Sequence, residues 1–122
     1  MPNKSALIVD DSFTMRNMVS LALKEQNFDV TTAEDGVDAL KASKGKKFDV
    51  IITDINMPNM DGFQLLEKLR AIEDFKFTPI LVLTTEGSDE KKKEGKRLGA
   101  TGWIVKPFNP QTLIATINKV CQ

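Results

Sequence analysis

The sequence contains no histidine and no tyrosine, and it has a single cysteine, Cys121, among its 122 residues. A chain without histidine cannot form a Ser-His-Asp triad, and neither histidine nor a pair of cysteines is present to ligate zinc. One cysteine also excludes an intramolecular disulfide. The chemistry of any functional site therefore depends on carboxylates, hydroxyl groups and lysines.

The sequence also lacks a charge imbalance and long apolar runs. Lys plus Arg number 17 and Asp plus Glu number 17, so the formal charge is zero and no DNA-binding surface is predicted. No apolar run approaches the roughly 20 residues of a membrane helix, and the first four residues contain no signal region. We expect a cytoplasmic protein without membrane insertion. A chain of this length is expected to form one domain, over residues 1–122.

Short apolar runs, each too short for an amphipathic helix, are typical of buried parallel strands. They cover residues 6–9, 50–53, 80–83 and 103–105, with a weaker strand at 28–32. Segments with helical spacing alternate with these runs, and the last begins with Asn109 as N-cap and Pro110 at the first helical position. This pattern predicts an α/β fold: a three-layer, doubly wound, five-stranded parallel sheet of flavodoxin-like order 2-1-3-4-5, with five helices.

Ligands of such a sheet bind beyond the carboxyl ends of the strands, near the switch point between the first and third strands. Asp10 and Asp11 follow the first strand, and Asp54 follows the third. Each alone also has a structural interpretation, because Asp11 or Ser12 could cap a helix and Asp54 opens a loop. Together they require a cation, since two carboxylates about 5 Å apart repel by roughly 3 kcal/mol at an effective dielectric of about 20. Oxygen-only ligands indicate Mg²⁺.

The remaining strands supply a hydroxyl group and an ammonium group. Thr84 ends the fourth strand and Lys106 follows the fifth, so both reach the sheet edge of the aspartates. A metal and a lysine neutralise the oxygens of a phosphoryl group, and a hydroxyl group bonds to one of them. We therefore predict that Asp54, which stands alone at the switch point, carries a phosphoryl group, whereas Asp10 and Asp11 suit the metal.

These residues resemble the receiver domain of two-component response regulators, and the resemblance covers essentially the whole chain. The motifs that carry it are LIVDDS with Asp10 and Asp11, IITDINMPNMDG with Asp54, ILVLTTEG with Thr84, and WIVKPF with Lys106. The stretches SFTMR and NMPNMDG make the chain most similar to single-domain chemotaxis regulators of the CheY type. The resemblance implies a receiver domain over residues 1–122 without an output domain.

The resemblance implies one bound Mg²⁺, for which Mn²⁺ or Ca²⁺ could substitute. Asp11 and Asp54 would ligate it directly, Asp10 would act mainly through water, and Asn56 would contribute its backbone carbonyl. Lys106 would pair with the phosphoryl group on Asp54.

The resemblance also implies residues that act in the conformational change on phosphorylation. Thr84 would move toward the phosphoryl group, with Trp103 as its aromatic switch partner. Asn56 and Glu86 match the positions that tune hydrolysis of the acyl phosphate in such proteins. The bond from Lys106 to the following proline is expected to be cis, which a prolyl bond permits at modest cost.

The implied phosphoryl donor is a phosphohistidine on a sensor histidine kinase of the chemotaxis type. A flagellar motor switch protein or a phosphatase is the candidate partner downstream. The chain would be a monomer and would catalyse only its own phosphorylation and dephosphorylation. A phosphoryl shuttle or phosphate sink in a phosphorelay stays open as an alternative role.

Three features depart from the family pattern. Trp103 stands where Tyr, Phe or His is usual, and its larger indole makes an inward swing harder in a close-packed interior. Thr85 stands where a small residue is usual, which narrows access to the site. The helix expected at 88–98 is almost wholly charged, with Gly95 in its middle, which indicates a solvated and mobile element.

Two other classes share related folds. A flavodoxin-like electron carrier must hold the FMN phosphate after the first strand, where Asp10 and Asp11 would repel it. A haloacid dehalogenase-type phosphatase uses a second aspartate two residues after its nucleophile, but Asn56 stands there. Both are remote alternatives.

Overall fold

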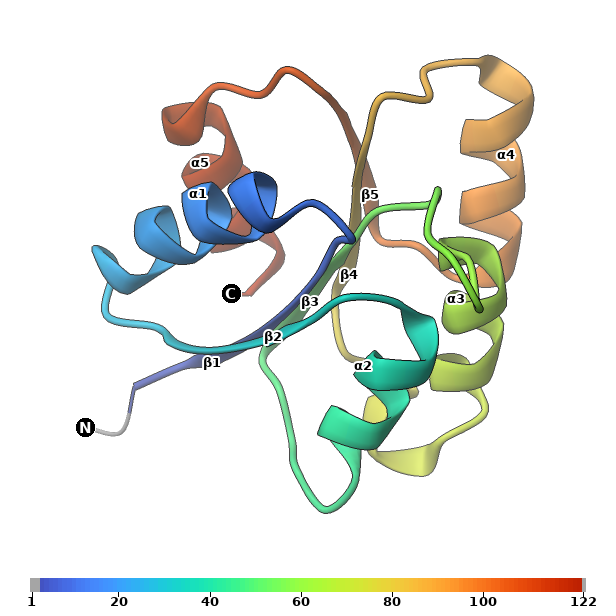
Figure 1. Cartoon of the computed structure of the whole chain (residues 1–122), viewed down its shortest axis with the longest axis horizontal. Helices are drawn as coiled ribbons and strands as arrows, with labels where there is room; N and C mark the ends of the chain where they lie inside the picture. The colour runs from blue at the N-terminus through green and yellow to red at the C-terminus, as the bar shows by residue number, and fades with distance from the viewer. Residues whose placement is uncertain (1–2, 122) are drawn as a thin grey trace.

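Strands and helices alternate along the whole of the described chain (Figure 1), which covers residues 3–121 of a computed structural model. The strands are β1 (Ser5–Val9), β2 (Asp29–Ala33), β3 (Val50–Thr53), β4 (Ile80–Thr84) and β5 (Gly102–Val105). The helices are α1 (Phe13–Lys24), α2 (Gly36–Ser43), α3 (Gly62–Arg70), α4 (Asp89–Leu98) and α5 (Pro110–Val120), with a short 3₁₀ helix, η1 (Glu73–Phe75). None of these helices is long and apolar enough to cross a membrane.

The five strands form one parallel sheet in the order β2-β1-β3-β4-β5. Helices α1 and α5 cover one face of the sheet, and α2, α3 and α4 cover the other (Figure 1). The predicted three-layer, doubly wound fold with order 2-1-3-4-5 is therefore confirmed. The order changes direction between β1 and β3, so their carboxyl ends border the switch point of the sheet.

Side chains of the central strands alternate between two hydrophobic clusters. In β1, Leu7 and Val9 pack on the side of α2, α3 and α4, whereas Ala6 and Ile8 pack on the side of α1 and α5. All four are almost completely buried. Burial on both faces is the reason that these strands are continuous apolar runs in the sequence. The packed sheet gives the residues that follow each strand fixed positions.

Several element boundaries differ from the prediction by one residue: β1 begins at Ser5, β4 ends at Thr84, β5 begins at Gly102 and α4 begins at Asp89. β2 covers Asp29–Ala33 instead of 28–32, because Asp29 pairs with Ser5 and the carbonyl of Ala33 accepts a hydrogen bond from the N–H of Asp10 (3.1 Å). The sequence did not predict η1. This turn is held by the side chain of Arg70, which donates to the carbonyls of Phe75 and Thr78 (both 2.7 Å).

Helix N-termini use the expected caps. Ser12, and not Asp11, is the N-cap of α1, since its side chain accepts from the N–H of Met15. Asn109 caps α5 and Pro110 follows at the first helical position, as predicted. The choice of Ser12 leaves the Asp11 carboxylate outside the cap and at the edge of the sheet, where the candidate site lies.

Candidate functional site

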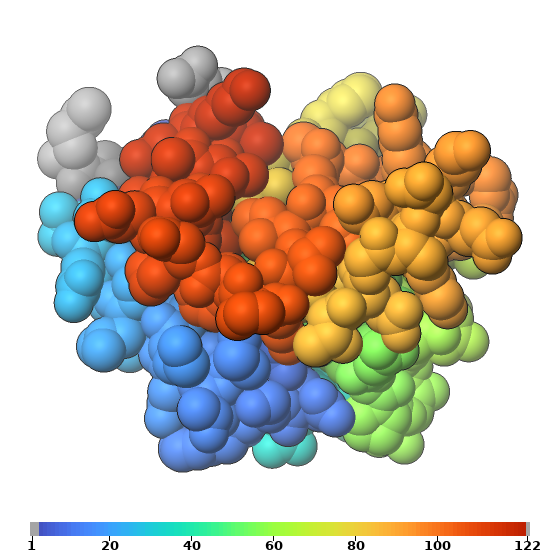
Figure 2. Space-filling model, turned by 90° about the horizontal axis from the view of Figure 1, so that it is seen from above, coloured from blue at the N-terminus to red at the C-terminus, as the bar shows by residue number. Residues whose placement is uncertain are grey.

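The carboxyl ends of four strands deliver the predicted site residues to one edge of the sheet. Figure 2 shows this end of the molecule from above, with the start of α1 (blue) next to the green segment after β3 and the orange connection between β5 and α5. Asp10 follows β1, Asp54 follows β3, Thr84 is the last residue of β4, and Lys106 follows β5.

Asp10, Asp11 and Asp54 form an acidic cluster. One carboxylate oxygen from each lies within 4.8 Å of the others. Asp10 and Asp54 are buried, and Asp11 is exposed. Such a cluster of acidic side chains is costly without a counter-charge, because carboxylates at this separation repel one another. The predicted convergence of these three side chains is therefore present in the structure.

Lys106 supplies part of the counter-charge. Its Nζ lies 2.8 Å from Oδ2 of Asp10 and 2.9 Å from Oδ2 of Asp54, and its side chain is only 11% exposed. Burial by itself would lower the pKa of Lys106, but the hydrogen bonds to Asp10 and Asp54 and their charges outweigh it, so the pKa is raised. Lys106 is thus held as an ammonium group between the two buried carboxylates. The bond between Lys106 and Pro107 is cis, as predicted.

Backbone groups fix the carboxylate of Asp54 from the other side. Its Oδ1 accepts from the N–H groups of Ile55 (2.6 Å) and Asn56 (3.3 Å), while Oδ2 faces Lys106. Both oxygens therefore already accept hydrogen bonds, which fixes the orientation of the carboxylate. A carboxylate fixed in this way can present one oxygen to an electrophile such as phosphorus.

Asp10 is fixed in a similar manner. Its Oδ1 accepts from the N–H of Ser12 (2.9 Å), and its backbone carbonyl accepts from the guanidinium of Arg16 (2.7 Å). No hydrogen bond from residues 3–121 reaches the carboxylate of Asp11. Asp11 is the acid of the cluster that is free to bind a ligand from solvent.

The donor set fits a hard divalent cation. The cluster offers oxygen atoms alone, which Mg²⁺ prefers, and within residues 3–121 it includes no histidine or cysteine. The formal charges of the three carboxylates and the Lys106 ammonium sum to minus two, a charge that one divalent cation would balance.

Asn56 and Glu86 contact each other at the rim of the site. The amide Nδ2 of Asn56 donates to Oε1 of Glu86 (3.2 Å), and the N–H of Glu86 donates to the hydroxyl oxygen of buried Thr84 (3.3 Å). The pair therefore connects the loop after β3 with the loop after β4. Thr85, next to Thr84, is exposed.

Trp103 lies on β5, partly buried beneath α4. Its indole Nε1 donates to the backbone carbonyl of Glu86 (2.8 Å), and its ring is 6.4 Å from the ring of Phe63, measured between centroids. The ring also packs on Gly95, which is buried. Gly95 is therefore a packing position of α4, while most of the charged side chains of this helix are exposed, as the charge pattern indicated.

Residues that sequence reasoning missed hold the loop after Asp54. A Cβ at Gly62 would lie 2.2 Å from the carbonyl oxygen of Asp54, so only glycine permits this approach. Asn59 adopts a φ of 67° and donates from its side chain to Asp35 (2.7 Å). The Asp-Gly pair at 61–62 is a visible turn signal, but its contact with Asp54 requires the fold.

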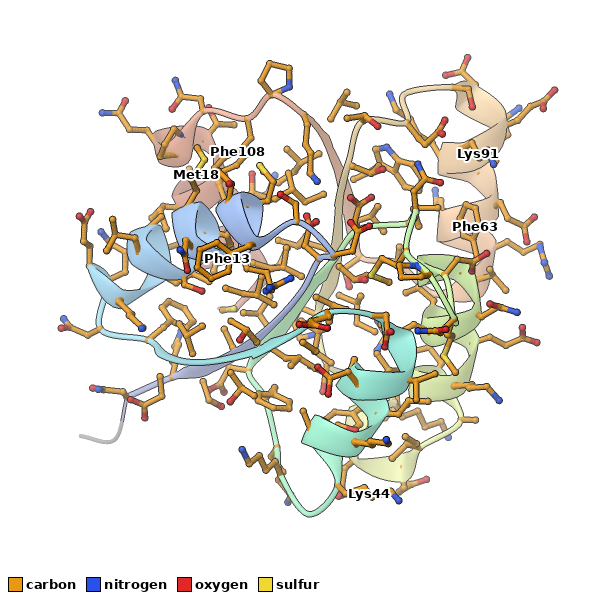
Figure 3. All side chains as sticks on the ribbon, in the orientation of Figure 1. Phe13, Met18, Lys44, Phe63, Lys91 and Phe108 are labelled. Carbon is orange, nitrogen blue, oxygen red and sulfur yellow. The ribbon has the colours of Figure 1, made fainter. Side chains whose placement is uncertain are left out.

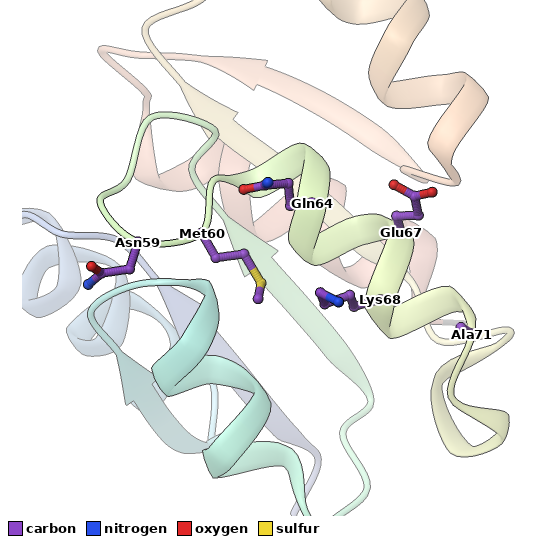
Figure 4. A pocket seen from close by; sticks show the side chains of 6 residues that line it. All are labelled: Asn59, Met60, Gln64, Glu67, Lys68 and Ala71. Carbon is purple, nitrogen blue, oxygen red and sulfur yellow. The ribbon is translucent and has the colours of Figure 1, made fainter.

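The loop after Asp54 also borders a surface pocket along α3 (Figure 4). Its lining residues are Asn59, Met60, Gln64, Glu67, Lys68 and Ala71. None of the three clustered aspartates lines this pocket. The candidate site at the carboxyl ends of the strands is thus separate from this pocket.

Comparisons with known proteins agree with this geometry. The sequence pattern of the response regulator receiver domain matches residues 6–118. The chain is 42% identical over 119 residues to chemotaxis protein CheY-3 of Vibrio cholerae serotype O1, covering 97% of this chain and 92% of that protein. It is 40% identical over 115 residues to chemotaxis protein CheY of Pseudomonas aeruginosa, covering 93% of each.

Solved structures give the same result. The chemotaxis response regulator CheY4 of Vibrio cholerae superposes with a TM-score of 0.92 and 52% identity, covering 97% of this chain and 98% of that one. A response regulator from Chloroflexus aurantiacus gives 0.92 and 33%, covering 98% of each chain. The chain belongs to the response regulator receiver domain family and is homologous to the CheY chemotaxis regulators. This membership decides against the flavodoxin and haloacid dehalogenase alternatives.

Proposed function

We propose that the protein is a phospho-accepting signalling switch that receives a phosphoryl group on Asp54 in a chemotaxis pathway. The observation that carries this proposal is the position of Lys106, whose ammonium group lies 2.9 Å from Asp54 within a cluster of three carboxylates. Lys106 also pairs with Asp10, and Asp11 lies in the same cluster. The arrangement has both the nucleophile and the counter-charges for transfer of a phosphoryl group.

Asp54 forms the new bond in the proposed reaction. One of its carboxylate oxygens attacks the phosphorus of a phosphohistidine, the bond from phosphorus to the histidine nitrogen breaks, and that nitrogen keeps the electron pair. The ammonium of Lys106 balances negative charge on the transferred group. The exposed Asp11 lies beside Asp54, which supports access for a donor histidine on a kinase, and the chain has no histidine of its own.

The residues proposed to hold Mg²⁺ are Asp10, Asp11, Asp54 and the backbone carbonyl of Asn56. When bound, the ion would neutralise oxygens of the phosphoryl group. Both oxygens of Asp10 and both oxygens of Asp54 already accept hydrogen bonds, whereas no bond from residues 3–121 reaches the carboxylate of Asp11. This supports a direct contact from Asp11, while the water-mediated contribution of Asp10 and the direct contact from Asp54 rest on the resemblance to the family.

Thr84 is the proposed first responder to phosphorylation. Its hydroxyl group is buried at the end of β4 and accepts from the N–H of Glu86 (3.3 Å), so it has a proton to donate to a new acceptor. A phosphoryl group on Asp54 provides that acceptor. Movement of Thr84 would alter the loop that leads into α4, which is how a local charge change reaches a binding surface.

The proposed partners follow from the relatives. The curated proteins that the chain resembles are chemotaxis proteins, which supports a histidine kinase of that type as donor and a flagellar motor switch protein or a phosphatase downstream. A phosphate sink would receive its phosphoryl group from the same kind of kinase but would have no downstream partner. A pull-down with the beryllofluoride form separates the two roles, because only the motor regulator retains a motor component.

Acetyl phosphate, a small phosphoryl donor, tests the central proposal without any partner. Incubation with labelled acetyl phosphate and Mg²⁺ should add one phosphoryl group per chain, and EDTA should prevent it. Mass spectrometry after borohydride reduction of the acyl phosphate should locate the group on Asp54. A chain that stays unlabelled in Mg²⁺, or that carries the label elsewhere, contradicts the proposal.

A further inference from the structure

The turn between β1 and α1 is held by hydrogen bonds to Asp10. Its N–H donates to the carbonyl of Ala33 (3.1 Å), and its Oδ1 accepts from the N–H of Ser12 (2.9 Å). Its own carbonyl accepts from Nη1 of Arg16 (2.7 Å). Asp11 lies inside this turn and is exposed, and no hydrogen bond within the described chain reaches its carboxylate. The position of Asp11 therefore depends on the backbone that its neighbours hold.

Arg16 binds a backbone carbonyl although carboxylates are close to it in the sequence. Its guanidinium takes part in none of the ion pairs of the described chain, and the Asp10 carbonyl is its hydrogen-bond acceptor. The Asp10 carbonyl and the Asp11 N–H belong to one planar peptide group. Arg16 therefore fixes the plane from which the Asp11 side chain departs.

The main chain of Arg16 is joined to the same turn. Its N–H donates to the carbonyl of Ser12 (3.0 Å), which is the N-cap of α1. The side chain of Arg16 thus reaches back over the first turn of the helix to Asp10. A change in the Arg16 side chain affects the turn directly, without any movement of the sheet.

Phe13 is the second contact of the guanidinium. Cζ of Arg16 lies 5.8 Å from the centre of the Phe13 ring, within the range of a cation–π contact. Figure 3 shows Phe13 on α1, and its side chain is 68% exposed. A guanidinium group can stack on a ring and donate a hydrogen bond in its plane at the same time. This contact gives a physical reason for an exposed phenylalanine at the start of α1.

We propose that Arg16 is a positioning residue of the metal site, which orients the Asp11 carboxylate toward Asp54 and thereby sets the affinity for Mg²⁺. This inference rests on the proposed role of the three clustered carboxylates in holding the ion. The observations that carry it are the bond from Arg16 to the Asp10 carbonyl and the convergence of the acidic oxygens within 4.8 Å. Groups that orient the ligands of a metal ion have a large effect on its affinity.

The charge of Arg16 has the opposite effect on the affinity. A positive charge near an acidic cluster repels a divalent cation, so removal of that charge alone would tighten Mg²⁺ binding. Loss of the bond to the Asp10 carbonyl frees the turn and weakens Mg²⁺ binding. The direction of the change therefore distinguishes positioning from charge.

Three variants and one control test the inference. Arg16→Met removes the charge and the N–H donors and keeps a long side chain. Arg16→Lys keeps the charge and a donor but loses the planar fork. Phe13→Leu keeps an apolar side chain and removes the stacked ring. Lys24→Met is the matched control, because it removes one positive charge from an exposed position at the other end of α1.

Isothermal titration calorimetry measures Mg²⁺ binding to the metal-free proteins without any phosphoryl donor. The dissociation constant should rise about tenfold in Arg16→Met and about threefold in Phe13→Leu. Arg16→Lys should lie between the wild type and Arg16→Met, since it retains one donor. Lys24→Met should bind Mg²⁺ with the affinity of the wild type.

Amide NMR spectra of the metal-free proteins report the turn itself. The signal of the Asp11 N–H should shift or broaden in Arg16→Met, because this N–H lies in the peptide group that Arg16 holds. The signals of Leu81 and Val82, which are buried in β4, should stay in place and show that the variant is folded.

The outcomes separate the inference from the proposed function. Tighter or unchanged Mg²⁺ binding in Arg16→Met overturns the inference, as does an unchanged Asp11 signal, which requires no metal. If Arg16→Met does not fold, wild-type affinity in Arg16→Lys overturns it instead. A wild-type chain that binds no Mg²⁺ overturns the proposed metal site and this inference with it. A wild-type chain that binds Mg²⁺ and accepts no phosphoryl group overturns the proposed phosphorylation alone.

Discussion

Nζ of Lys106 lies 2.9 Å from Oδ2 of Asp54, although 52 positions separate the two residues in the sequence. The same Nζ lies 2.8 Å from Asp10, at a separation of 96 positions. One ammonium group therefore joins the carboxyl ends of β1, β3 and β5. The arrangement places one positive charge between the carboxylates of Asp10 and Asp54.

Asp54→Asn should abolish labelling by acetyl phosphate in Mg²⁺, because an amide cannot act as an anionic nucleophile. The fold should persist, since the amide oxygen can still accept from the N–H groups of Ile55 and Asn56. Asp61→Asn is the matched control, because asparagine also caps the start of α3. Mass spectrometry measures the phosphoryl group incorporated by each variant. Normal labelling of the Asp54 variant would refute Asp54 as the phosphorylation site.

Asp11→Asn should raise the free energy of unfolding in EDTA by about 1 kcal/mol, because it removes one like charge from an exposed position beside two other carboxylates. The same change should reduce the stabilisation that Mg²⁺ provides. Urea unfolding with and without Mg²⁺ measures both effects. Asp74→Asn, an exposed carboxylate outside the cluster, serves as control. A lower stability of the Asp11 variant in EDTA would argue against repulsion in the cluster.

Gly62→Ala should lower the free energy of unfolding by about 3 kcal/mol or more, since a Cβ would lie 2.2 Å from the Asp54 carbonyl and the backbone must move. Movement of this backbone also displaces the nucleophile, so labelling by acetyl phosphate should slow. Gly87→Ala makes the same chemical change at a position with ordinary contacts. Thermal melts and labelling rates that are equal in the two variants would show that the close approach is unimportant.

Arg70→Lys should destabilise the fold by about 2 kcal/mol, because a single ammonium group cannot replace the guanidinium fork. The Arg70 side chain donates to the carbonyls of Gly99, Phe75 and Thr78 at distances between 2.7 and 3.1 Å. It thus joins the end of α3 to the turns before β4 and β5. Chemical denaturation compares this variant with Lys68→Gln on the exposed face of α3. Equal denaturation midpoints for the two variants would show that the guanidinium group of Arg70 does not stabilise the fold.

The fold was predictable from the sequence because its signals are local and repeated. Apolar runs buried on both faces identified the strands, and alternation with helical spacing identified the parallel topology. The η1 turn was not predictable, because Arg70 holds it from another element. The start of β2 shifted by one residue for a similar reason, since pairing with β1 sets its register.

The convergence of the site residues was predictable because topology alone brings the ends of parallel strands to one edge. Contacts between side chains of different helices and strands were not predictable. Nothing in the charge pattern of α4 reveals that Gly95 packs on Trp103, since size complementarity between a helix and a strand depends on their distance in the fold. Gly62 was visible as a turn residue, and its approach to the Asp54 carbonyl depends in the same way on where α3 begins.

The sheet order has a consequence for folding itself. The carboxylates come from the ends of β1 and β3 and their ammonium partner from the end of β5, so the charge balance of the cluster is complete only when the last strand has joined the sheet. A fragment that ends before Lys106 keeps every carboxylate and loses the one side chain within residues 3–121 that pairs with two of them. Such a fragment should therefore depend more strongly on a divalent cation for its folding than the whole domain does. For the whole domain, the melting temperature should rise with the concentration of a cation that binds only the folded form.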